Sequence, residues 1–177
     1  MTQSPNRGLS SLHTLPIAIT GLMVSIALIF SYLEVLLPFN IGVPGIKLGV
    51  ANIVIIVALY YFNGKYAMII NIVRIFISGL LFSGVFGIIY SLAGGLLSLL
   101  TMILLKRVRI FSVTGVSIAG GVMHNLGQML IASILVGNSG VFVYFPVLVI
   151  SGVVCGFVTG VLSFLILRYL PSRGNTL

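Results

Sequence analysis

Long runs of apolar residues follow one another along the chain, and short groups rich in polar residues, glycine or proline separate them. No run alternates apolar and polar positions, which is the pattern of a membrane strand. A helix needs about 20 residues to cross the hydrocarbon core of a membrane. The runs that predict such helices are 15–37, 45–62, 66–82, 87–105, 113–136 and 143–170. The pattern therefore predicts an all-α integral membrane protein, a bundle of six transmembrane helices.

The basic residues lie mostly at the ends of these runs, on one side of the predicted membrane. Only Lys47 lies on the opposite side, and Arg74 lies within the membrane. Lys and Arg are enriched in cytoplasmic loops, so the distribution predicts cytoplasmic N- and C-termini and an even number of spans. The residues expected on the cytoplasmic side are Arg7, Lys65, Lys106, Arg107, Arg109, Arg168 and Arg173.

The same pattern divides the chain into three parts. A cytoplasmic N-terminal tail over 1–14 precedes a transmembrane domain over 15–170, and a cytoplasmic C-terminal tail over 171–177 follows. The first apolar run is too long for the core of a signal peptide, so a retained helix is expected. We expect a multi-pass protein of a cell membrane, such as a bacterial plasma membrane.

Composition agrees with membrane lipid as the main surroundings of the protein. The 177 residues are 59% hydrophobic and 6% charged, whereas soluble domains are about 25% charged. The net charge of +8 is not evidence for a nucleic-acid partner. The basic residues lie where membrane topology places them, and the charge is high because the chain has only one acidic residue.

The chain lacks the residues that several kinds of catalytic or metal-binding site require. The chain has no aspartate, so it cannot supply the carboxylate oxygens of a Mg²⁺–diphosphate site. It has no GxxxxGK[ST] phosphate-binding loop. Its single cysteine and its two distant histidines form no metal-ligand pattern. We therefore expect no catalytic residues, no metal, no cofactor and no enzyme activity of its own.

Polar residues inside the predicted helices are the candidates for ligand binding, since such groups are costly in lipid. Arg74 lies near the middle of its span, on one helical face with Asn71. His124 and Gln128 share a face of the fifth span at a similar depth. We expect these two faces to meet in one pocket. The predicted substrate-binding residues are Arg74, His124, Gln128, Asn71, Asn125, Asn52 and Tyr90.

Three partners for Arg74 stay open. They are the only acidic residue, Glu34, near the outer end of the first span; neighbouring polar groups such as Asn71 and His124; and an anionic or electron-rich ligand, which a guanidinium fits well. The outer loops are rich in glycine and proline and are expected to cover the pocket. The predicted lid contains Asn40, Pro44 and Lys47, together with the loops near Ser83 and Asn138.

Small residues recur at every fourth position in two spans. Such rows let helices approach closely. Gly152, Gly156 and Gly160 predict packing within the bundle. In the first span, Gly21 with Ser25 and Ala27 with Ser31 predict a face on which a partner membrane protein docks.

The segments "KLGVANI", "YSLAGG" and "HNLGQ" carry a family resemblance. The chain resembles the heptaprenyl diphosphate synthase component I family, also called the Gx transporter family, from about residue 17 to 167. That family is similar in turn to the substrate-binding S components of energy-coupling-factor (ECF) transporters. The resemblance implies an S-component-like bundle that binds a small organic molecule, such as a vitamin, flavin or precursor. A membrane coupling subunit and two ATPases would complete the transporter.

Two other functions stay open. In the first alternative, the protein is a membrane subunit of a quinone- or isoprenoid-handling complex, or of a flavin-linked electron-transfer complex. In the second alternative, it is an accessory component of heptaprenyl diphosphate synthase. This component would be non-catalytic, because the chain lacks the aspartates that a prenyltransferase needs.

Overall fold

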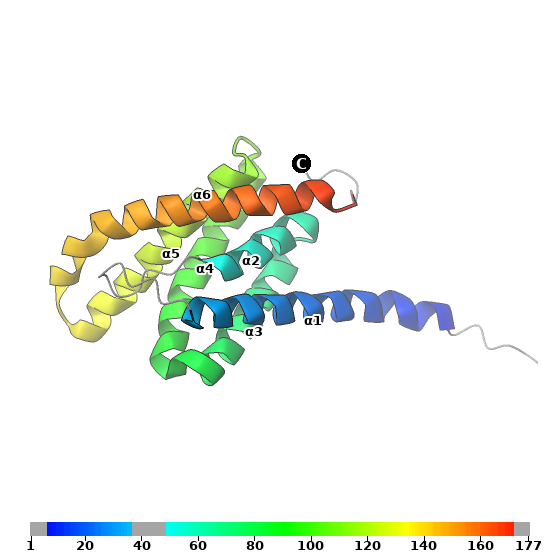
Figure 1. Ribbon diagram of the computed structural model, residues 1–177, viewed down its shortest axis with the longest axis horizontal. Coiled ribbons are helices and arrows are strands. Elements are labelled where there is room, and N and C mark those ends of the chain that lie inside the picture. The colour runs from blue at the N-terminus through cyan, green and yellow to red at the C-terminus, as the bar shows by residue number, and fades with distance from the viewer. Residues whose placement is uncertain (1–6, 37–48, 172–177) are drawn as a thin grey trace, which may run out of the picture.

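The computed structural model describes residues 7–36 and 49–171, and every regular element in this part of the chain is a helix (Figure 1). A π-helical turn, η1 (Gly79–Ser83), joins α3 to α4, and a 3-10 helix, η2 (Ser139–Tyr144), precedes α6. The prediction of an all-α fold is confirmed for these residues. The helices are α1 (Arg7–Leu36), α2 (Val50–Tyr61), α3 (Gly64–Ser78), α4 (Gly84–Val108), α5 (Val113–Val136) and α6 (Phe145–Tyr169).

Four helical stretches in the described residues are long and apolar enough to cross a membrane. They indicate a multi-pass membrane protein. A fifth helix, α2, is apolar but has only 12 residues. The four long stretches are Ile17–Leu36, Gly64–Val108, Val113–Val136 and Gly140–Tyr169.

The predicted helix ends are accurate where apolar residues stop at a capping residue. The side chain of Ser112 accepts a hydrogen bond from the Gly115 backbone nitrogen, so α5 begins at Val113 as predicted. By contrast, α1 begins at Arg7, inside the predicted tail. Polar residues mark where a helix leaves the hydrocarbon, and they need not end the helix itself.

The stretch 64–108 doubles back on itself. Gly84 has a positive φ of 68°, which ends η1 and starts α4 in a new direction. Beyond the reversal α3 and α4 lie side by side, because a Cβ added to Gly95 would stand 2.9 Å from Ile75 Cδ1. The predicted lid loop near Ser83 is therefore wrong: the segment is a helical reversal with no extended loop.

The short helix α2 lies at the centre of the bundle. It packs against α1, α3 and α6, and residues 51 and 53–60 are buried. A helix that is apolar on all sides needs such surroundings. Figure 1 shows α2 between α1 and α6, and shows the start of α1 and the end of α6 at the same end of the molecule.

The helices α5 and α6 meet along a row of glycines. A Cβ on Gly156 would lie 2.7 Å from Ile118 Cα, and one on Gly152 would lie 2.8 Å from Val122 Cα. A Cβ on Gly160 would lie 2.8 Å from Thr114 Cα. These backbones touch only because side chains are missing, so the predicted packing role of this row is confirmed.

Candidate functional site

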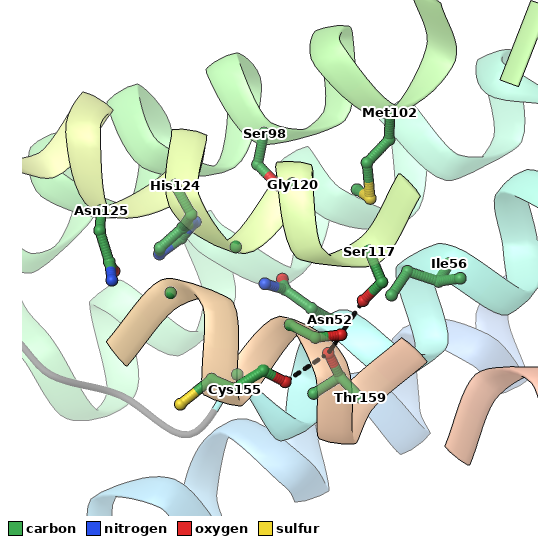
Figure 2. Close-up of a pocket in the computed structure, with 14 residues that line it drawn as sticks. Asn52, Ile56, Ser98, Met102, Ser117, Gly120, His124, Asn125, Cys155 and Thr159 are labelled. Atoms are coloured by element: carbon green, nitrogen blue, oxygen red, sulfur yellow. Dashed lines mark hydrogen bonds between the residues drawn. The ribbon is translucent and has the colours of Figure 1, made fainter. Parts of the chain in front are cut away.

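A small cavity lies between α2, α4, α5 and α6 (Figure 2). Its volume is about 30 Å³, enough for about two water molecules. Glycines of α5 and α6 and the apolar side chains of Ile56 and Met102 form part of its wall. The polar residues that line it are Asn52, Ser98, Ser117, His124, Asn125 and Thr159.

Glycines leave room for this cavity and also fix its walls. Gly120 and Gly121 on α5 line it together with Gly152 and Gly156 on α6. A Cβ on Gly120 would stand 2.8 Å from the sulfur of Met102 on α4, so α5 touches α4 on one side. A Cβ on Gly121 would collide with the carbonyl oxygen of Gly152 on the other side. The space is therefore a local gap in tight packing.

Three of the lining polar residues are used in holding α5 against α6. The hydroxyl groups of Ser117 and Thr159 are hydrogen-bonded at 3.1 Å, and Thr159 also donates to the Cys155 carbonyl oxygen at 2.9 Å. The amide nitrogen of Asn125 donates to the Leu148 carbonyl oxygen at 2.7 Å. These groups satisfy one another or the backbone, so their first role is structural.

Two lining residues have hydrogen-bonding capacity that the described residues leave unused. Neither the side-chain amide of Asn52 nor the hydroxyl of Ser98 has a hydrogen-bond partner in residues 7–36 and 49–171. Ser98 is only 3% exposed. Figure 2 shows the Asn52 amide extending from α2 into the space between α5 and α6. Such groups are costly in an apolar interior, and a bound polar molecule would satisfy them.

Arg74 lies in a separate cluster that joins α3 to α1 and α4. Its Nη2 donates to Asn71 Oδ1 at 2.9 Å, and its Nη1 donates to Ser31 Oγ at 3.4 Å. Asn71 Nδ2 in turn donates to the Gly95 carbonyl oxygen at 3.1 Å. The guanidinium is buried, and its Nε has no partner among the described residues. Glu34 lies near enough to act electrostatically on Arg74.

Arg74 and His124 lie on different sides of α4. Two adjacent glycines of α4 mark the separation: a Cβ on Gly95 would meet Asn71, and a Cβ on Gly94 would meet His124. Sequence spacing gives the depth of a residue along its helix, but it does not say which neighbour the residue faces. The structure therefore does not bring the two predicted polar faces into one pocket.

The predicted binding residues divide into two groups. Those that line the cavity are Asn52, His124 and Asn125, and those that do not are Arg74, Asn71, Gln128 and Tyr90. A ligand role for either group stays a prediction. The predicted lid residues Asn40, Pro44 and Lys47 lie outside the described residues.

The predicted docking residues also divide. Gly21 and Ser25 are exposed on α1. Ala27 is fully buried, and Ser31 is buried where it accepts the hydrogen bond from Arg74. The docking prediction is therefore corrected for Ala27 and Ser31, because a partner cannot reach them while α1 packs on α2 and α3.

Sequence reasoning missed Thr159. Thr159 lies within the glycine row of α6, directly before Gly160. Because close helix packing alone accounts for that row, no binding role was expected within it. A polar residue on a helix face that otherwise consists of glycine is the signal that was available. Ser98 is a polar residue within the predicted span 87–105, but nothing in its spacing indicates that it faces α5.

A model of the heptaprenyl diphosphate synthase component I family matches residues 23–166, most of the chain. The chain belongs to the heptaprenyl diphosphate synthase component I family. The family resemblance inferred from the motifs is thereby confirmed. Searches of curated proteins and of solved structures give no match. Among the described residues of this component I protein, no group of three or more His, Cys, Asp or Glu side chains is placed to hold a metal ion.

Proposed function

We propose that this component I protein is the substrate-binding membrane subunit, like an S component, of an ECF-type transporter for a small organic molecule. The observation that carries the proposal is the cavity inside the apolar bundle, where Asn52 and Ser98 present unused hydrogen-bonding groups. Polar groups buried in a membrane protein mark substrate pathways and sites.

The path of the chain supports six membrane crossings. In this proposal the stretch 64–108, which reverses at Gly84, crosses twice, and the predicted span 45–62, of which α2 is the described helix, adds one more crossing. With Ile17–Leu36, Val113–Val136 and Gly140–Tyr169, this gives an even number of spans. The described ends of the chain lie at one end of the molecule, in agreement with two cytoplasmic termini (Figure 1).

In the proposed topology the cavity lies beneath the start of α2 and nearer the cytoplasmic ends of α4 and α5. Gly49 lines the cavity and comes directly before α2, whereas Met102 lies one turn from Lys106 on α4 and Ser117 lies one turn from the start of α5. A cavity of about 30 Å³ must widen to hold an organic molecule.

Transport requires a source of energy that the chain does not carry, since it has no phosphate-binding loop. We propose a membrane coupling subunit and two ATPases as partners. Gly21 and Ser25 are exposed small residues on α1 and are the part of the predicted docking face that a coupling subunit can reach. Membrane lipid covers the remaining apolar surface.

The experiment is to purify the protein from membranes in mild detergent and to identify co-purified compounds and proteins by mass spectrometry. A water-soluble organic compound together with ATPase subunits supports the proposal. Menaquinone or a polyprenyl phosphate with no water-soluble compound contradicts it and favours the quinone- or isoprenoid-handling complex.

The description of the family favours a second candidate, an accessory component of heptaprenyl diphosphate synthase. The chain has one acidic residue, so catalysis would belong to a soluble, aspartate-rich partner. Under this function the protein co-purifies with such a chain and raises its prenyltransferase activity. Assays of that activity with and without component I distinguish the two functions.

A further inference from the structure

The described wall of the cavity carries no Lys, Arg or Glu side chain. A charged molecule in a low-dielectric site needs a partner of opposite charge, because burial removes its hydration. The buried cation of the bundle, Arg74, lies on the other side of α4 and is hydrogen-bonded to Asn71 and Ser31. Among the described residues, the wall therefore offers no permanently charged side chain with which a charged ligand could pair, and its one side chain that can become a cation is the imidazole of His124.

The wall instead offers neutral groups that both donate and accept. The side chain of Asn52 has an acceptor oxygen beside a donor nitrogen, and the hydroxyl of Ser98 donates and accepts. Asn52 comes from α2 and Ser98 from α4, so the two approach the cavity from different helices. Ile56 and Met102 add apolar surface next to them.

We infer that the molecule bound here is uncharged at neutral pH and has an amide-like edge, with adjacent donor and acceptor, on an otherwise apolar body. Asn52 pairs with that edge and Ser98 adds one hydrogen bond, while Ile56 and Met102 contact the apolar body. The inference rests on the proposed function and adds to it the chemical class of the ligand. It replaces the expectation of an anionic ligand held by Arg74.

The test uses the full-length protein purified from membranes, and its probe is the compound that the protein retains. The compound is released by heat, identified by mass spectrometry, and assayed for charge by its binding to anion and cation exchangers at pH 7. Four proteins are compared: the wild type, Asn52→Leu, Ser98→Ala and the control Thr101→Ala. Thr101 lies one turn from Ser98, does not line the cavity and bonds to the Leu97 carbonyl oxygen of its own helix.

We expect an uncharged compound that the wild type and Thr101→Ala retain equally. Retention should fall about tenfold or more in Asn52→Leu and several-fold in Ser98→Ala, as for the loss of hydrogen bonds in a dry site. Size-exclusion profiles check that each variant is folded. If Asn52→Leu does not fold, Asn52→Ser replaces it, since serine keeps a polar group but is too short to span the amide edge.

Two results overturn the inference and leave the proposed function standing. One is a retained compound that binds an ion exchanger at pH 7. The other is an uncharged compound that all four proteins retain equally. A third result, in which no variant retains a compound and a total metabolite extract does not raise the melting temperature of the wild type, contradicts the proposed function itself.

Discussion

The guanidinium of Arg74 donates a hydrogen bond of 2.9 Å to the side-chain oxygen of Asn71, one turn earlier on α3. Asn71 uses its amide nitrogen to reach the backbone of α4, and Arg74 uses its second terminal nitrogen to reach Ser31 on α1. A single buried charge thus connects three helices. This geometry is that of a structural tie, because the terminal nitrogens of the guanidinium are directed at the protein itself.

Arg74→Ala should therefore lower stability more than it lowers ligand retention. Two hydrogen bonds are lost and Asn71 Oδ1 loses its donor, while removal of a charge eases burial in the membrane. The net loss in free energy of unfolding is expected to be about 1–2 kcal/mol. The measurement is thermal unfolding in detergent, followed by a thiol-reactive dye at Cys155, which is half-buried.

The same samples separate the structural role from a ligand role. Retained compound per folded protein should stay within about twofold of wild type, as for a residue that does not line the cavity. An unchanged melting temperature with loss of the compound would restore Arg74 as a ligand-binding residue.

Glu34 stabilises the start of α2 from outside that helix. Its Oε1 accepts a hydrogen bond of 2.7 Å from the Val50 backbone nitrogen, and Gly49, the residue before the helix, provides no side-chain cap. A carboxylate at a helix N-terminus also interacts favourably with the helix dipole. Glu34→Ala should speed hydrogen exchange of the Val50 amide about tenfold.

Glu34→Gln is the matched control. Glutamine keeps an acceptor oxygen but loses the charge, so the acceleration should be smaller than in Glu34→Ala. Exchange at amides of α6 should not change in either variant. Equal exchange at Val50 in all three proteins would show that this contact does not hold α2 in place.

The helices were predictable because a membrane helix depends on the residues of its own segment. Apolar length identifies a membrane helix without knowledge of its neighbours, and α5 begins and ends where the pattern stops, between Ser112 and Gly137. The glycine row of α6 was predictable for a similar reason, since small residues at every fourth position have few uses other than close packing.

The site was only partly predictable because it depends on which helices are neighbours. His124 and Arg74 have similar depths, yet α4 stands between them, and no spacing within one helix reveals that. For the same reason Ala27 and Ser31 were expected on a docking surface but are buried against the bundle. A connection between the spans 66–82 and 87–105 was predicted, but its helical form was not, because one glycine among several gives no sign of a positive φ.

Close packing of α5 and α6 gives a prediction with an internal control. A Cβ on Gly156 would lie 2.7 Å from Ile118 Cα and 2.8 Å from the Ser117 carbonyl oxygen, and backbone atoms cannot move aside cheaply. Gly156→Ala should therefore destabilise the protein by about 1–3 kcal/mol. Gly21→Ala, where a Cβ meets nothing within 4 Å, should be neutral or stabilising by up to about 1 kcal/mol.

The two glycine variants are compared by thermal unfolding in the same detergent. Each replaces one helical glycine by alanine, so intrinsic helix propensity changes equally in both. The difference between them reports the helix contact alone. Equal melting temperatures would mean that α6 can shift away from α5 without cost, contrary to a rigid glycine contact.

The proposed membrane topology can be tested by labelling single cysteines on either side of α4. In a Cys155→Ala background, Ser83→Cys reports the reversal before Gly84, and Ile110→Cys reports the turn after α4, where Ile110 is 80% exposed. A membrane-impermeant maleimide should label Ser83→Cys in intact cells and Ile110→Cys only after permeabilisation, because basic residues hold the turn after α4 inside. If the stretch 64–108 crossed the membrane once, Ser83 would lie within the hydrocarbon and stay unlabelled under both conditions. Labelling of Ile110→Cys in intact cells, with Ser83→Cys protected, would instead keep the two crossings and reverse the orientation derived from charge.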